Sequence, residues 1–66
     1  MEKVIGYNIV KEGRGYVVML KYQTDNGINF WPFTGMGWKP IKYKQPKDEV
    51  EKVIKSFFPE ALNLEA

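Results

Sequence analysis

Residues 16–33 read YVVMLKYQTDNGINFWPF, and this stretch decides the fold. Its first eight residues alternate, so that Val18 and Leu20 fall on one face and Met19 on the other, which is typical of a β-strand. The TDNG tetrapeptide at 24–27 follows, and an Asn-Gly pair between apolar runs is the strongest short-range signal of a hairpin turn. The stretch therefore predicts two antiparallel strands, over residues 16–23 and 28–33.

The second of these strands contains Pro32. Proline has no backbone N–H to donate to a neighbouring strand, so we expect this strand to lie at an edge of the sheet or to end at the proline. On the N-terminal side, residues 3–11 alternate in the same way, and Gly13 and Gly15 allow a tight turn before residue 16. The three strands form a meander, and residues 41–44 are a candidate for a short fourth strand.

A single helix is predicted after the strands. Its apolar positions are spaced like one face of an α-helix, and they are Val50, Val53, Ile54, Phe57 and Phe58. Pro46 suits the first turn, and Pro59 ends the helix because it disfavours helical geometry at the residue before it. We expect a helix over about 47–58 and a tail over 59–66, in a single domain spanning 1–66. The fold class is α+β, an antiparallel three- to four-stranded β-meander with one C-terminal α-helix packed on one face.

One helix cannot cover both faces of such a sheet. About twelve helical residues span about 18 Å, which suffices for one face of three or four strands. The opposite face keeps apolar side chains in water unless Leu62 and Leu64 of the tail fold back over it. The candidates for that face are Val4, Val10, Val17 and Met19, with either Phe30 or the pair Trp31 and Phe33. Uncovered apolar patches of this kind usually mark a site for a partner.

The residue inventory argues against catalysis and metal binding. The 66 residues include no Cys and no His, which excludes a thiolate nucleophile, an imidazole base and the usual zinc ligands. The only serine, Ser56, lies inside the predicted helix without a base to activate it. The glycine triplets at 13–15 and 35–37 are too short for a phosphate-binding motif. We therefore expect no enzyme, no catalytic residue, no cofactor and no metal.

The aromatic residues and methionines point instead to binding. Trp, Tyr, Phe and Met are the side chains enriched at protein interfaces and among their hot spots. The leading hypothesis is a small non-enzymatic interaction module, of the kind found in regulatory accessory proteins, which docks an aromatic-rich surface on a protein partner of unknown identity. Association with a second copy of the chain, as a homo-oligomer, is part of this hypothesis. The residues expected to bind the protein partner are Met19, Trp31, Phe33, Met36 and Trp38.

The segment 31–47 supports an alternative, the binding of single-stranded nucleic acid. It carries aromatic rings and lysines but no acidic residue, and single strands combine stacking on rings with pairing of phosphates to cations. The nucleic-acid-binding candidates are Lys39, Lys42, Tyr43, Lys44 and Lys47. The same residues also fit core aromatics beside lysines that protect a strand edge. The net charge of +2 decides nothing between these options.

The order of elements is similar to the WGR domain of poly(ADP-ribose) polymerases. The likeness covers residues 16–58 in layout: aromatic residues at the end of a strand, a glycine-rich turn and a helix that ends in Phe57-Phe58. That family binds DNA, which is what the resemblance implies here. The Trp-Gly-Arg motif that defines the family is absent, because Trp31 is followed by Pro32 and Phe33, so no residue role carries over.

The distribution of apolar residues favours a cytoplasmic protein without a membrane partner. The longest apolar run, residues 16–20, is far shorter than the roughly 20 residues of a membrane span. The first three residues lead directly into the first predicted strand, without the apolar core of a signal peptide.

Overall fold

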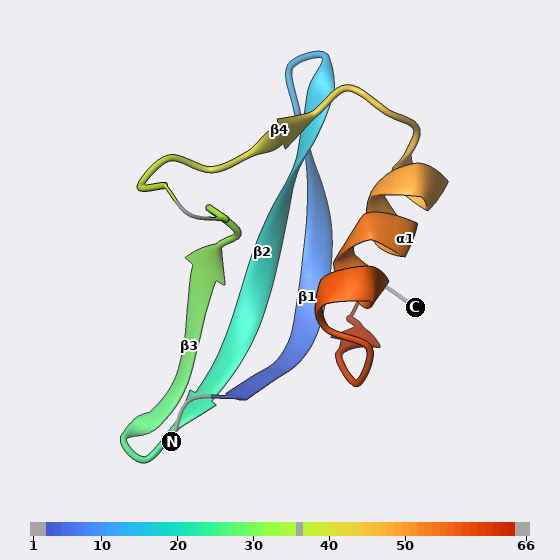
Figure 1. Ribbon diagram of the computed structural model, residues 1–66. Helices are drawn as coiled ribbons and strands as arrows, with labels where there is room; N and C mark the ends of the chain where they lie inside the picture. The colour runs from blue at the N-terminus through green and yellow to red at the C-terminus, as the bar shows by residue number, and fades with distance from the viewer. Residues whose placement is uncertain (1–2, 36, 65–66) are drawn as a thin grey trace.

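A computed structural model describes residues 3–35 and 37–64. Its described elements follow the chain in the order β1 (Lys3–Glu12), β2 (Gly15–Thr24), β3 (Gly27–Pro32), β4 (Lys42–Tyr43), α1 (Lys47–Phe57) and β5 (Leu62–Asn63). The strands form one sheet in the order β3-β2-β1-β5, and β4 pairs with the start of β2, beyond the end of β3 (Figure 1). The predicted α+β fold, a largely antiparallel sheet followed by one C-terminal helix, is confirmed.

The two predicted hairpins are both present. β1 and β2 pair antiparallel up to Glu12 and Gly15, and Gly13 between them has the positive φ of 60° that a tight turn requires. In the second turn, the Thr24 hydroxyl donates to the Gly27 carbonyl oxygen at 3.1 Å and accepts the N–H of Asn26 at 3.2 Å. β3 lies at the edge of the sheet, as Pro32 predicted.

The sheet has two short strands beyond the three of the meander. β4 is the candidate fourth strand, reduced to two residues that oppose Tyr16 and Val17 of β2. It can come this close because Gly15 has no side chain: a Cβ there would lie 2.7 Å from the backbone oxygen of Tyr43. β5 is formed by the tail and pairs parallel to β1, with Leu62 opposite Gly6. A strand of two residues has no period, so alternation could not predict it.

The helix has the predicted position and ends one residue earlier. Pro46 is its N-cap residue, directly before the first turn, and Phe58 has left helical geometry with φ −133° and ψ 73°. The cause is Pro59, whose ring disfavours the helical conformation of the residue before it. Two ion pairs lie along the exposed side of the helix, Lys55 with Glu51 at 3.5 Å and Lys52 with Glu49 at 3.6 Å.

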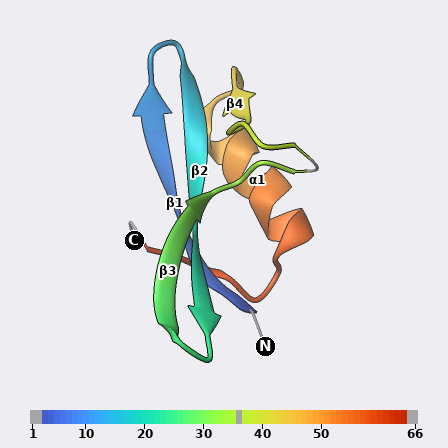
Figure 2. The ribbon, with the colours of Figure 1, turned by 90° about the vertical axis from the view of Figure 1, so that its left-hand side faces the viewer.

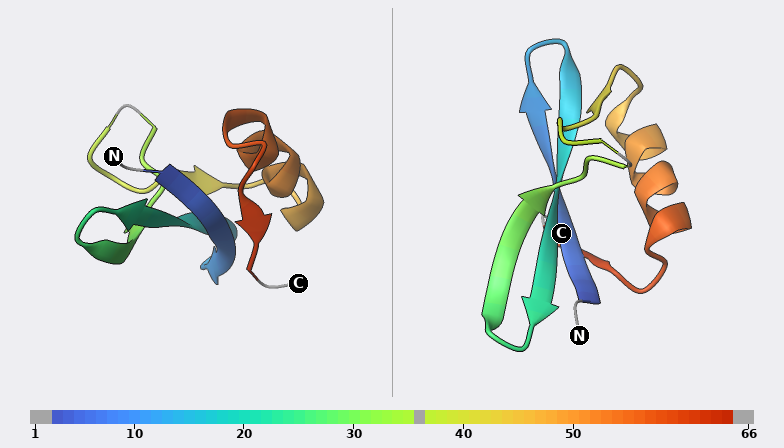
Figure 3. Two further views of the ribbon diagram at one scale, coloured as in Figure 1. Left: turned by 90° about the horizontal axis from the view of Figure 1, so that it is seen from below. Right: turned by 60° about the vertical axis from the view of Figure 1, so that its left-hand side comes forward.

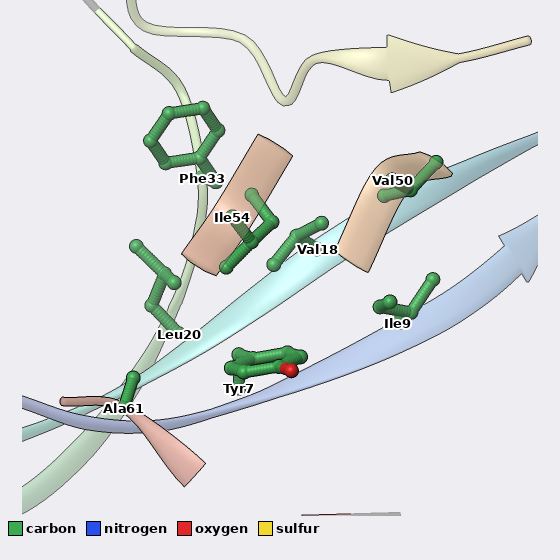
Figure 4. Packing of buried hydrophobic residues seen from close by; sticks show 8 residues of the cluster. All are labelled: Tyr7, Ile9, Val18, Leu20, Phe33, Val50, Ile54 and Ala61. Carbon is green, nitrogen blue, oxygen red and sulfur yellow. The ribbon is translucent and has the colours of Figure 1, made fainter. Parts of the chain in front are cut away.

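The core lies between α1 and the first two strands. Figure 4 shows its side chains, which are Tyr7, Ile9, Val18, Leu20, Phe33, Val50, Ile54 and Ala61. The Tyr7 hydroxyl donates to Oε1 of Glu51 at 3.0 Å and so ties β1 to the helix. The pKa of Tyr7 is raised to about 12, mainly by burial and secondly by this hydrogen bond. The same bond lowers the pKa of Glu51.

A bulge in β1 changes the face of one residue. The pairing of β1 with β2 shifts between Val4 and Gly6, so that Ile5 is the extra residue. Simple alternation predicts that Val4 lies on the face opposite the helix, and this prediction is wrong. The bulge returns Val4 to the helix side, where it packs against the core.

Candidate functional site: an aromatic hollow beside the edge strand

The pairing of β2 with β3 decides which way the aromatic residues of β3 point. Trp31 lies opposite Leu20 and Asn29 lies opposite Tyr22, whereas Phe30 lies opposite Lys21. Directly opposed residues of an antiparallel pair share a face, so Trp31 is on the helix side of the sheet and Phe30 on the other. α1 lies beside β1, at the other end of the sheet from β3 (Figure 3), and the Trp31 side chain therefore stays 61% exposed.

The loop between β3 and β4 completes a surface around Trp31. It lies on the same side of the sheet as α1 (Figure 2). Its base is closed by the N–H of Ile41, which donates to the Phe33 oxygen at 3.1 Å, and its tip by the N–H of Gly37, which donates to Thr34 at 3.0 Å. This turn holds Trp38 out in solvent, with its side chain 100% exposed.

Strands β2 and β3 and this loop border an open hollow of about 650 Å³. Its described lining residues are Tyr22, Thr24, Asn29, Trp31, Pro32, Thr34, Gly35, Gly37 and Trp38. Three of them are aromatic, and none of the described ones is charged. The hydroxyl and amide groups at its border can take part in hydrogen bonds. The hollow is therefore suited to a ligand that packs on rings and carries no charge.

The structure brings together two of the five predicted protein-binding residues, Trp31 and Trp38. Phe33 does not line the hollow, because it belongs to the core: it is 8% exposed, and its ring centroid lies 5.4 Å from that of Phe57. Met19 is half-buried and adjoins Leu20 in β2, so alternation places it on the face of the sheet away from the hollow. Met36 lies outside the described residues.

The lysines of the alternative hypothesis do not line the hollow. Lys42 forms an ion pair with Glu12 at 3.6 Å, and Tyr43 is half-buried against the core, where burial raises the pKa of its hydroxyl. The other three candidates, Lys39, Lys44 and Lys47, are exposed. The described lining of the hollow includes none of these five residues.

Sequence reasoning missed Tyr22, Thr24 and Asn29 as members of the site. The signal that could have found them is the two-residue turn at 25–26, because a turn of that length sets the register of the hairpin. Counting outward from the closing pair of Thr24 and Gly27 places Asn29 opposite Tyr22, and two further steps place Trp31 opposite Leu20.

The face of the sheet opposite α1 is only partly covered. Leu64 of the tail lies over Gly6, where an added Cβ would come within 2.8 Å of its side chain. At the other end of this face, Ile28 and Phe30 are 54% and 51% exposed, and the ammonium of Lys21 lies 5.9 Å from the centre of the Phe30 ring. The tail therefore covers this face near β1 but not near β3.

Other kinds of site find little support in the described part of the chain. No three acidic side chains gather there in a way that could hold a metal ion. No helix among the residues described is long and apolar enough to cross a membrane. Comparisons with family models, with curated proteins and with solved structures give no match. The geometry of the hollow is thus the basis for assigning a function.

Proposed function

We propose that this protein is a small interaction module that docks an extended, uncharged segment of a partner protein in the aromatic hollow. The observation that carries this proposal is the exposure of Trp31 and Trp38, which both line a hollow whose described lining residues carry no charge. Tryptophan is mostly buried on average in folded proteins. Two exposed tryptophans around one hollow are typical of the anchors of a binding site.

The class of segment follows from the chemistry of the lining. Grooves lined by aromatic rings recognise proline-rich segments in the polyproline II conformation. Such a segment has no internal hydrogen bonds, so its carbonyl oxygens can accept bonds from groups such as the Asn29 amide and the tryptophan indoles. Its pyrrolidine rings are apolar and uncharged, which suits the hollow. The proposed ligand is therefore a proline-rich segment of another protein.

The charge distribution favours this ligand over single-stranded nucleic acid. A single strand needs cations beside the rings on which its bases stack. The described lining of the hollow offers rings without cations, and Lys42 lies beside the carboxylate of Glu12. The hollow thus supplies rings on which bases could stack but, among its described lining residues, no cation for the phosphates.

The test is a titration of the intrinsic tryptophan fluorescence with a ten-residue polyproline peptide. We expect a saturable change for the native chain and at least about 30-fold weaker binding for Trp38→Ala, which corresponds to about 2 kcal/mol for a hot-spot residue. The matched control is Phe30→Ala, which removes an exposed aromatic ring from the opposite face and should leave the affinity unchanged.

A parallel titration uses a mixed-sequence single-stranded oligonucleotide at low salt. Binding of the oligonucleotide together with no response to the peptide would overturn the proposal in favour of a nucleic-acid ligand. Equal affinity of the native chain and Trp38→Ala for the peptide would place the binding site elsewhere and overturn it as well.

A further inference from the structure

The outer edge of β3 lacks the usual protection against other strands. Among the described strands, β3 ends the sheet on one side, and its five residues before Pro32 are all exposed. Natural edge strands commonly carry charged side chains that prevent pairing with another chain. The outer edge of β1 is paired only over its short contact with β5, and its open part carries Lys11 and Glu12. By contrast, β3 has no charged residue at all.

The direction of the backbone groups along β3 follows from one hydrogen bond. The N–H of Phe33 donates to the Val18 oxygen of β2 at 2.7 Å. These groups alternate in direction along an antiparallel strand, so Asn29 and Trp31 also direct theirs toward β2. Ile28 and Phe30 direct their N–H and C=O groups away from the sheet. Pro32 belongs to this outward set, where its missing N–H costs the sheet nothing.

We propose that two copies of this chain form a two-fold dimer by antiparallel pairing of their β3 strands, with Ile28 opposite Phe30 of the partner subunit. Both outward residues of each strand then exchange backbone hydrogen bonds with the partner, which joins the two sheets into one. The two-fold axis passes beside Asn29, which faces Asn29 of the partner subunit. This pairing does not depend on the ligand of the hollow.

Pro32 selects this register over the next one. If Phe30 were opposite Phe30 of the partner subunit, the ring of Pro32 would face the outward carbonyl of Ile28, where a donor is required. With Ile28 opposite Phe30, Pro32 lies beside Asn26 of the partner's turn, outside the ladder. The proline therefore limits the pairing to the uncharged residues between it and the turn.

The side chains of Ile28 and Phe30 indicate that the strand that pairs with the β3 edge comes from a second copy of this chain. Ile28 and Phe30 lie on the face opposite α1 and are about half exposed. In the proposed register, Ile28 of each subunit is the cross-strand neighbour of Phe30 of the partner subunit. Aromatic and β-branched side chains make favourable cross-strand pairs. No charge meets a like charge, because β3 contains none. The second copy thus gives each of these two side chains an apolar neighbour at the edge, where the tail leaves this face open.

A disulfide trap tests the register. The chain has no cysteine, so a single introduced cysteine can only link two copies. In the proposed dimer, Asn29 lies directly opposite Asn29 of the partner subunit, and the two residues exchange no backbone hydrogen bonds. Pairs of this kind have the shorter Cα–Cα distance of an antiparallel ladder, which suits a disulfide. Under mild oxidation we expect Asn29→Cys to give a covalent dimer on a non-reducing gel. The control is Gln23→Cys, which is exposed on β2, one strand away from the edge. It should form no covalent dimer and should run as a single chain on the same gel.

The mass in solution tests the interface without a cross-link. By light scattering, the native chain should approach twice its 7.7 kDa as its concentration rises, whereas Phe30→Lys should stay at the single mass. Val10→Lys adds the same charge to an exposed position of β1 and should still dimerise. The proposal is overturned if the native chain stays at 7.7 kDa, if Asn29→Cys does not cross-link, or if Val10→Lys rather than Phe30→Lys abolishes the dimer. Trp38→Ala should dimerise normally, which separates this result from the outcome of the peptide titration.

Discussion

Leu20 and Trp31 lie directly opposite each other on neighbouring strands and on the same face of the sheet, yet Leu20 is 1% exposed and Trp31 is 61% exposed. Both side chains are large and apolar. The difference lies in what is above them: α1 covers the part of the sheet that contains β1 and β2, and β3 is beyond its reach. On this face of the sheet, position under the helix, rather than hydrophobicity, therefore decides which residues are buried.

The widths of the elements explain where this boundary falls. An α-helix with its side chains is about 10 Å across, and neighbouring strands are about 4.8 Å apart. One helix thus covers about two strands, and the expectation that its length would suffice for three or four was wrong because it ignored the width of the helix. A third strand with large apolar residues needs another cover, and in this chain we propose two: a ligand in the hollow on the helix side and a second copy of β3 at the edge.

The largest effect is expected from a truncation under the helix. Leu20→Ala removes a buried side chain from the centre of the core and should lower the free energy of unfolding by about 3 kcal/mol, from lost burial and the cavity left behind. Urea unfolding followed by circular dichroism measures this loss. Ile28→Ala, an apolar truncation on the exposed strand, should cost well under half as much. Equal losses at the two positions would mean that β3 is as well packed as β2.

A smaller effect is expected from the hydrogen bond that joins β1 to the helix. The pKa of Tyr7 is raised from 10.0 to about 12 in the folded chain, so folding favours the neutral phenol. Its contribution to stability is complete below pH 10 and is lost as the pH rises from 10 to 12, by at most about 2.7 kcal/mol in total. Unfolding free energies measured over this interval should fall for the native chain.

The control for this pH dependence is Tyr7→Phe. It removes the phenol hydroxyl and should lower stability by about 1 kcal/mol at neutral pH, the value of one hydrogen bond. The variant should then be less sensitive than the native chain between pH 10 and 12. An unchanged alkaline slope would assign the sensitivity to other groups.

The elements that could be predicted from the sequence are those with a local signal. The Asn26-Gly27 turn, the period of the long strands and the helix bounded by prolines each depend on a few adjacent residues. The face of Val4 could not be predicted from alternation, because a bulge at Ile5 reverses it. Phe33 could not be separated from Trp31 as a core residue, because its burial depends on where β3 ends and on the rings of Phe57 and Phe58 that it meets. The hollow depends on the path of the loop back to β4, which joins residues distant in sequence.

The most direct test of the central claim is the unfolding free energy of the double variant Trp31→Ala, Trp38→Ala, measured by urea unfolding with circular dichroism. If the two tryptophans serve binding rather than folding, removing both should lower stability by about 1 kcal/mol or less, as for other exposed substitutions. A loss of about 3 kcal/mol, equal to that of Leu20→Ala, would show that the tryptophans hold the fold together and would contradict the account.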